Sequence, residues 1–366
     1  MEMILHAAGE LLGTDPSRPV DLGGSTRSTV LRCRTALGGS VVVKSFRDGP
    51  EGRRAFASEA AGLSLGLAGP ELLGVDASVP LLVMADLGSA PTLADVLLGD
   101  DPEAAVEGLL AWARGLGRLA AGSVHRRADL ARLRARYGGV GENGENAASG
   151  DEERWIAQRI TALLALLAEA GIMTPEGLAE ELAEIETTIW DEYPVFTPGD
   201  TCPDNNLITP EGLRLIDFEA ACFQSVFLTA AYCRMPFSTC WCAFRLPAGV
   251  AEKIEQAFRL EVVAAYPALA EEAVWQAGIR RAVAAWTVNT TVWLLPRTAE
   301  DGPLHRTRRP VPTRRQLLLH RWEAASALEE FPALTRTMRR LLREVTGNWE
   351  TPPLPGYPAF ETRGIR

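Results

Sequence analysis

Residues 196–208 of the chain read FTPGDTCPDNNLI, and residues 213–219, a few positions further on, read LRLIDFE. Glycine and proline in the first segment favour a turn, so Asp200 is expected on a loop, with Asn205 five residues later. The second segment is an apolar strand that ends in Asp217. A short hairpin between the two segments would bring two carboxylates and one carboxamide together. Hard oxygen ligands of this kind suit Mg²⁺.

Upstream of this segment, one lysine stands out. Only two of the 37 basic residues are lysines, Lys44 and Lys253. Lys44 lies in the β-rich run 40–46, and Glu59 lies in segment 53–67, whose apolar residues recur at helical spacing. A lysine ammonium is a compact point charge that a planar guanidinium does not reproduce. A functional role for Lys44 is therefore favoured over that of a solvated lysine at the end of a strand. Glu59, taken without Lys44, would be interpreted as an ordinary exposed acidic residue of a helix.

The order of these motifs is similar to that of a known family. The pattern G-D-x-x-x-x-N, followed by a strand ending in I-D-F, resembles the catalytic core of the aminoglycoside phosphotransferase and choline kinase family. The resemblance extends upstream to Lys44, to Glu59 and to the hinge-like sequence LLVMADLG at 81–88, and it covers roughly residues 17–220. It implies an α+β chain with a two-lobed protein-kinase-like fold, a small β-rich N-lobe and a large helical C-lobe.

The resemblance also implies a role for each polar residue. Phosphoryl transfer depends mainly on positioning and charge stabilisation. By resemblance, Lys44 would hold the α- and β-phosphates of ATP, and Glu59 would orient Lys44. Asp200 would accept the proton of the attacking hydroxyl or orient it. Asn205 and Asp217 would bind Mg²⁺.

The nucleotide contacts that the resemblance implies are made by backbone groups. Adenine would bind after the last strand of the small lobe, at Met84, Ala85 and Leu87. The phosphates would lie under a flexible turn that contains Gly23, Gly24 and Ser25. A Gly-Gly-Ser turn is also common in hairpins, so this last role has an ordinary structural alternative.

Two positions depart from the family pattern. Pro198 stands where the family usually has a histidine, and Glu219 stands where a glycine often follows the D-F pair. The proline bears on how the loop packs, and D-F-E also occurs among small-molecule kinases. The five main positions are intact, so a pseudokinase is not the favoured interpretation.

The rest of the chain predicts a division into lobes. The N-lobe is expected at 1–84, the hinge at 85–91 and the C-lobe, with the acceptor site, at 92–366. Helical periodicity dominates the C-lobe, with two short strands near 194–197 and 206–216, a Gly-rich loop at 138–151 and an extended proline-containing tail from 351. The helices are expected at 92–98, 102–122, 152–171, 175–190, 249–264, 269–290, 313–330 and 333–346.

Composition excludes several classes of protein. The chain has 366 residues, of which 47% are hydrophobic and 23% charged, so a wholly disordered chain is excluded. No apolar run is long enough to cross a membrane, and the N-terminus does not have the pattern of a signal peptide. The net charge of −10 argues against a general nucleic-acid binder. Six irregularly spaced cysteines are typical of reduced thiols in a cytoplasmic protein, and those at 222, 233, 240 and 242 have no common zinc spacing.

One basic cluster has two interpretations. Residues 305–310 read HRTRRP, and the cluster runs from Arg306 to Arg315. It is either a solvated loop or a site for an acidic substrate or peptide. The sequence therefore predicts an ATP- and Mg²⁺-dependent phosphotransferase that acts on a hydroxyl of a small molecule. A kinase that modifies Ser or Thr of a peptide in a natural-product pathway, and a nucleotide-binding pseudokinase, are the alternatives.

Overall fold

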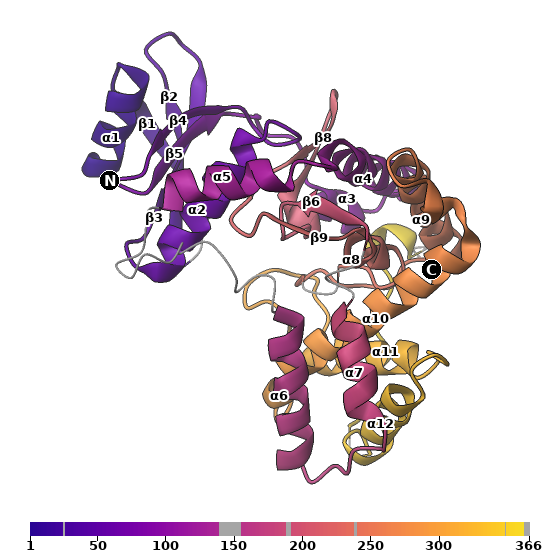
Figure 1. Cartoon of the computed structure of the whole chain (residues 1–366). Helices are drawn as coiled ribbons and strands as arrows, with labels where there is room; N and C mark the ends of the chain where they lie inside the picture. Colours follow the sequence, from indigo (N-terminus) through magenta and orange to yellow (C-terminus); the bar gives the residue numbers. More distant parts are fainter. Residues whose placement is uncertain (25, 139–154, 188–191, 238–239, 348, 362–366) are drawn as a thin grey trace.

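The computed structural model describes residues 1–24, 26–138, 155–187, 192–237, 240–347 and 349–361. A β-sheet with two helices beside it forms the N-terminal end, and the remaining helices form the rest of the molecule (Figure 1). The predicted α+β architecture, with a β-rich N-lobe and a helical C-lobe, is confirmed. The lobe boundaries at 84 and 91 stay a prediction, and the Gly-rich loop predicted at 138–151 falls almost entirely outside the described residues.

The N-terminal sheet has five antiparallel strands in the order β1-β2-β3-β5-β4. Their bounds are β1 Ser17–Gly24, β2 Ser28–Arg34, β3 Ser40–Phe46, β4 Leu72–Asp76 and β5 Leu81–Ala85. The central strand β3 places Lys44 opposite Val30 of β2 and Leu82 of β5. Because successive side chains of a strand point to opposite faces, Lys44 and the buried Val43 lie on different sides of the sheet.

Two helices cover the two faces of this sheet. On the face of Val43, α1 (Glu2–Leu12) buries Ala8 against the strands. On the other face, α2 (Pro50–Ser64) begins with a proline at its first turn and buries Phe56 edge-on against Phe46. The helical spacing at 53–67 indicates one helix in this lobe, and the structure adds a second at residues 2–12, which covers an otherwise exposed apolar face.

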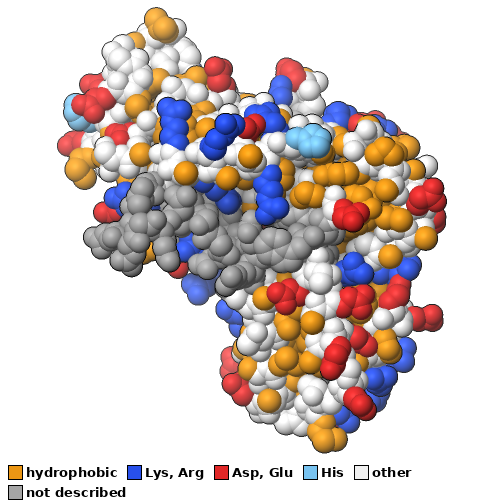
Figure 2. Space-filling view, viewed as in Figure 1, with side chains coloured by type: hydrophobic (Ala, Val, Ile, Leu, Met, Phe, Trp, Pro, Cys, Tyr) orange, Lys and Arg blue, Asp and Glu red, His pale blue; other side chains and the backbone are white. Residues whose placement is uncertain are grey.

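The C-terminal helices agree with most of the predicted segments. Their bounds are α3 Leu93–Leu97, α4 Pro102–Ser123, α5 Arg127–Gly138, α6 Trp155–Glu169, α7 Leu178–Glu186, α8 Val226–Ala230, α9 Ala248–Val263, α10 Glu272–Leu294, α11 Arg314–Ala325 and α12 Pro332–Glu344. Helices α6, α7, α11 and α12 gather at the end of the molecule remote from the sheet, and α10 packs against α6, α7 and α11 (Figure 1). The helix α5 was not predicted, and basic side chains gather along it (Figure 2).

Short strands hold the two loops that carry the polar motif. β6 (Pro194–Thr197) pairs with β9 (Cys222–Ser225), and β7 (Asn206–Thr209) forms a hairpin with β8 (Gly212–Leu215). The hairpin is tied to the neighbouring segments at both strands, since the Ile208 amide donates to the Pro91 carbonyl at 2.9 Å and the Leu215 amide to the Ala68 carbonyl at 3.2 Å. The short hairpin predicted between the two motif segments is therefore present, and residues 206–216 form its two strands and the turn between them.

The predicted extended tail is packed against the C-lobe. Tyr357 is fully buried, and its hydroxyl donates to the Cys242 carbonyl at 2.7 Å. The Arg245 amide donates to the Pro355 carbonyl at 2.9 Å, and the Tyr357 amide donates to the Arg245 carbonyl at 3.1 Å. The segment after α12 therefore supports the loop around Cys242. In the described part of the chain, no helix combines the length and apolar character needed to span a bilayer.

Candidate active site

The centre of the site is Lys44, which lies between two carboxylates. Its Nζ is 2.5 Å from Oε2 of Glu59 on α2 and 2.7 Å from Oδ1 of Asp217, which follows β8. Lys44 is 5% exposed and Glu59 is 2% exposed, whereas the side chain of Asp217 is 32% exposed. The three residues come from a strand, a helix and a loop separated by up to 173 positions, so the fold brings the predicted set together.

Burial and charge act in opposite directions on this cluster. Burial alone would lower the pKa of Lys44, but the charges of Glu59 and Asp217 outweigh it and hold the pKa above its ordinary value. Burial raises the pKa of Glu59 to about 7, and the charge of Lys44 opposes that rise. Lys44 is therefore a cation at neutral pH, and Asp217 is the more exposed of its two carboxylate partners.

Asp200 lies on a loop that approaches the segment after Asp217. Gly199 has a φ of +89°, and a Cβ at that position would lie 2.1 Å from the carbonyl oxygen of Ala220. Only glycine fits this turn without moving the neighbouring backbone. The Oδ1 of Asp200 accepts a hydrogen bond of 3.0 Å from the backbone amide of Cys202. This contact fixes the carboxylate relative to the rest of the loop.

The pKa of Asp200 is raised to about 6. Burial is the largest cause, and the negative charges of Asp217, Asp204 and Glu219 add to it. The hydrogen bond from Cys202 acts in the opposite direction. A carboxylate with a pKa near neutral is suited to accept a proton.

Asn205 ends the short 3₁₀ turn Pro203–Asn205. The side-chain Nδ2 of Asn205 donates to the backbone carbonyl of Asp200 at 3.3 Å. The backbone carbonyl of Asn205 accepts from the amide of Ile216 at 3.0 Å. These contacts link Asp200 to the residue before Asp217. They also leave the carboxamide oxygen of Asn205 as its ligand atom for a cation.

Glu219 adds a further carboxylate to the site. Oxygen atoms of Glu59, Asp217 and Glu219 all lie within 4.8 Å of one another. Arg27, just after the β1–β2 turn, forms an ion pair with Glu219. The sequence showed Glu219 only as a departure from the family pattern, and Arg27 was missed altogether. The only signal for either was the position of Glu219 directly after the Asp-Phe pair.

The predicted glycine turn lies at this same side of the sheet. Gly23 and Gly24 have φ values of +98° and +151° and pair with Val30 and Thr29 of β2. Ser25 lies outside the described residues. Because Arg27 reaches Glu219, the chain just beyond the turn contacts the carboxylate cluster.

The predicted hinge is held firmly to the sheet. Met84 is buried in β5, and the amide of Ala85 donates to the Glu71 carbonyl at 2.8 Å. Asp86 forms an ion pair with Arg32, accepts a hydrogen bond of 3.0 Å from Arg32 Nη2, and accepts another of 2.7 Å from Ser40 Oγ. Leu87 follows, half-buried. The adenine contacts expected at Met84, Ala85 and Leu87 stay a prediction.

The arginine cluster divides into two groups. Arg314 and Arg315 donate to backbone carbonyls and act in local structure. Arg308 lies over the ring of Trp241, with its guanidinium carbon 4.9 Å from the ring centroid. Trp241 Nε1 in turn donates to Oδ2 of Asp204 at 2.8 Å. The first part of the cluster is therefore linked to the loop of Asp200, and a role in binding an acidic group stays a prediction.

The cysteines correct one prediction. Cys202, two residues after Asp200, forms a disulfide with Cys240, so the expectation of six reduced thiols is wrong for this pair. Cys33, Cys233 and Cys242 are free thiols. Spacing missed the disulfide because its partners are 38 residues apart and meet only when the loop of Asp200 folds against residues 240–242.

No protein-family model matches the chain, and no curated protein is significantly similar to it in sequence. Solved structures do match over most of their length. A candidate fructosamine-3-kinase from Thermobifida fusca has a TM-score of 0.51 and 19% identity, with 94% of this chain and 99% of that chain covered. An ethanolamine kinase from Plasmodium vivax has a TM-score of 0.51 and 11% identity, with 87% and 83% covered. A choline kinase from Cryptosporidium parvum has a TM-score of 0.52 and 10% identity, with 88% and 93% covered.

These similarities establish the protein-kinase-like fold, as the motif order predicted. The class is that of a two-lobed chain in which a buried lysine of the small lobe meets an aspartate of the large lobe. Within that class, the fold of the chain is similar to that of the choline, ethanolamine and fructosamine kinase structures.

Proposed function

We propose that the chain is an ATP- and Mg²⁺-dependent phosphotransferase whose acceptor is a hydroxyl group of a small molecule. The observation that carries this proposal is the position of Lys44, buried between Glu59 and Asp217 in a kinase-like fold. A buried lysine costs desolvation energy, so a lysine held by two carboxylates in a chain with only one other lysine requires a specific reason. Binding the phosphates of a nucleotide is such a reason.

The residues of the small lobe would bind the nucleotide. Lys44 is a cation that donates hydrogen bonds to phosphate oxygens, and Glu59 fixes its direction. The turn of Gly23 and Gly24 would offer backbone amides to the phosphates. These groups position the nucleotide before the reaction, so they cost no reorganisation during it.

The large lobe would hold the metal and the acceptor. Asp217, the oxygen of Asn205 and the nearby Glu219 form a set of hard oxygen donors that fits Mg²⁺. The excess of negative charge that raises the pKa of Asp200 also favours a bound cation. Mg²⁺, when bound, neutralises phosphate charge. Asp200 would accept the hydroxyl proton at its carboxylate.

The acceptor class follows from the similar structures by analogy. Their names are choline, ethanolamine and fructosamine kinases, each of which names a small-molecule acceptor. A peptide acceptor is the alternative that Arg308 favours, since its guanidinium lies near the Asp200 loop. A cytoplasmic location remains part of the proposal.

The first test measures the nucleotide alone. Isothermal titration with Mg·ATP should show binding to the wild-type protein and to Lys253→Met, and much weaker binding to Lys44→Met. Release of ADP is then measured against a panel of amino alcohols, sugars, antibiotics and acidic peptides, with and without Mg²⁺. Failure of Mg·ATP to bind would refute the proposal. Binding without turnover of any acceptor would favour the pseudokinase.

A further inference from the structure

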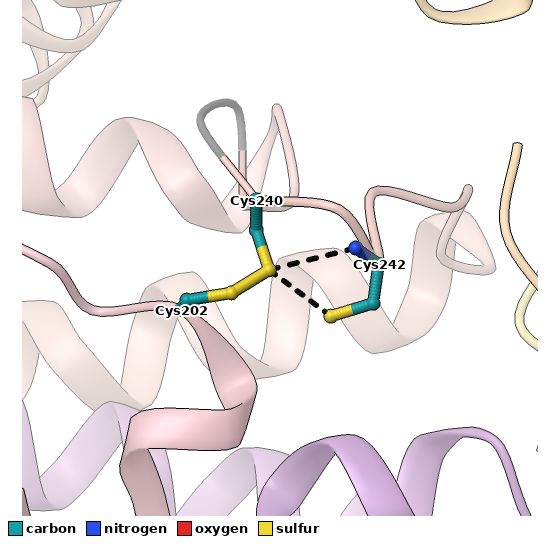
Figure 3. Close-up of side chains that lie close together, drawn as sticks. All are labelled: Cys202, Cys240 and Cys242. Carbon is teal, nitrogen blue, oxygen red and sulfur yellow. Dashed lines mark hydrogen bonds between the residues drawn. A yellow bond between two sulfur atoms is a disulfide. The ribbon is translucent and has the colours of Figure 1, made fainter. Parts of the chain in front are cut away.

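Three cysteine sulfur atoms meet beside the loop of Asp200. Cys202 and Cys240 form the disulfide, and the Sγ of Cys242 is 3.2 Å from the Sγ of Cys240 (Figure 3). All three side chains are buried, and their sulfur atoms lie within 4.8 Å of one another. Among the described residues, this is the one group of three cysteines gathered in this way.

The disulfide alone does not account for the third sulfur. Cys242 has its thiol directed at the bonded pair, and its backbone amide also donates to Cys240 Sγ at 3.5 Å (Figure 3). Its position is fixed from two sides, because Tyr357 donates to its carbonyl and Trp241 beside it donates to Asp204. The three sulfur atoms are therefore held together by the surrounding fold as well as by the disulfide.

Three converging sulfur atoms form a soft ligand set. Cysteine thiolates select thiophilic metals such as Zn²⁺ and Cu⁺, whereas the oxygen cluster around Asp217 suits hard cations. We propose that Cys202, Cys240 and Cys242, when the disulfide is reduced, bind one thiophilic metal ion, with Zn²⁺ as the expected occupant. The proposal concerns a second site, and it does not depend on the phosphotransferase activity.

Charge favours Zn²⁺ over Cu⁺ at this position. Three thiolates leave a net charge of −1 with Zn²⁺ and −2 with Cu⁺. The charges of Asp204 and Asp200 act on Cys242, and Arg308 opposes them, so the surroundings already carry excess negative charge. The less negative complex is therefore easier to bury. Zinc keeps a fourth coordination position, which a ligand outside these three residues would take.

The conversion of the disulfide form into the zinc-bound form needs a two-electron reductant, and a dithiol supplies both the electrons and the protons. The dithiol gives two electrons and two protons to the Cys202–Cys240 bond, which yields two thiols, and it becomes a disulfide itself. Zn²⁺ then replaces the protons of the three thiols. In both states Cys202 is tied to residues 240–242, and its amide donates to the carboxylate of Asp200. The site would thus fix the Asp200 loop in reducing as well as oxidising conditions.

The test measures metal content in defined redox states. Wild-type protein is reduced with a phosphine, dialysed against Zn²⁺ and analysed by mass spectrometry of the metal. A parallel titration with Cd²⁺ follows the thiolate-to-metal absorption band, and a Cu⁺ arm identifies the alternative occupant. We expect one Zn²⁺ per chain in the reduced protein and none in the oxidised protein.

Two variants locate the site. Cys242→Ser should lower Zn²⁺ affinity at least about 100-fold, since removing a ligand costs more than removing an outer-sphere partner. Cys233→Ser, which replaces another buried free thiol, should bind Zn²⁺ as the wild type does. If Cys242→Ser does not fold, Cys202→Ser serves in its place.

Several outcomes would overturn the proposal. These are a reduced protein that binds no stoichiometric metal, equal Zn²⁺ binding by Cys242→Ser and wild type, and a disulfide that is reduced only when the protein unfolds. Stoichiometric Cu⁺ with no Zn²⁺ would overturn the assignment of zinc.

Discussion

Replacing Lys44 by methionine should destabilise the protein in a pH-dependent way. Glu59 is 2% exposed, and burial raises its pKa from 4.5 to about 7. Because the pKa of Glu59 is higher in the folded than in the unfolded state, the free energy of unfolding falls as the pH rises from about 4.5 to about 7. Above pH 7 the ionised carboxylate stays buried in the wild type, because Lys44 neutralises its charge. In Lys44→Met that partner is absent, so Glu59 must keep its proton in the folded state at pH 8.

The size of the effect follows from the interval between the pKa and the pH. At pH 6, Glu59 is mostly protonated in both proteins, so the loss of Lys44 adds no proton-linked cost. At pH 8, about one pH unit above the wild-type pKa, holding the proton costs Lys44→Met about 1 kcal/mol more than wild type. With about 2.1 cal/mol/K of unfolding entropy per residue, a chain of 366 residues should show an extra fall in Tm of about 1–2 °C. A pH-independent loss of charge-assisted hydrogen bonds, about 1.5–3 kcal/mol, adds to it.

The assay is thermal unfolding followed by circular dichroism at pH 6 and pH 8, both above the sequence pI of about 5.1. Lys253→Met is the matched control, since Lys253 is exposed on α9 and its loss should change stability by less than about 0.5 kcal/mol. A loss of stability in Lys44→Met that is equal at the two pH values, or larger at pH 6, would refute the reasoning.

Three further predictions concern the loops of the site. Asp200→Asn should keep Mg·ATP affinity within a few-fold of wild type in calorimetry but lower turnover about 10²–10⁴-fold, and Asp217→Asn should weaken both. Wild-type turnover should rise with pH through about 6, because Asp200 accepts a proton only when it is ionised; a flat rate profile from pH 5 to 8 would contradict this. Gly199→Ala should lower the free energy of unfolding, measured with denaturant, by at least about 2 kcal/mol, because Gly199 has a positive φ and a Cβ there would contact Ala220. Gly122→Ala in α4 is the control: it has open space around it, so the change should be neutral or stabilising by up to about 1 kcal/mol.

The sequence was sufficient for the order of the motifs, and therefore for the fold, whereas the roles of the site residues stay a prediction. Lys44, Glu59 and Asp217 each follow a recognisable strand or helix pattern, and the fold does bring them together. Lys44 contacts Glu59, which is 15 residues away in the sequence, and Asp217, which is 173 residues away. No rule of local spacing predicts contacts between residues so far apart in the sequence. They became predictable only through the resemblance to a known arrangement.

The features that were missed have weak local signals. The helix α5 is rich in arginine and buries only Leu130 fully, so its sequence has no broad apolar stripe. The helix α1 has such a stripe, but the apolar face of the sheet that it covers is apparent only once the strands are paired. The ion pair of Arg27 with Glu219 likewise depends on the path of the β1–β2 turn.

The scarcity of lysine has a practical consequence for chemical modification of the chain. An amine-acylating reagent meets two lysine side chains, of which Lys253 is exposed on α9 and Lys44 is shielded in an ion pair. Acylation removes the positive charge of a lysine and needs the free amine, which the raised pKa of Lys44 makes scarce. A fluorophore or a solid support can therefore be attached at Lys253 on the helical lobe, while the ion-paired cluster around Lys44 stays chemically intact.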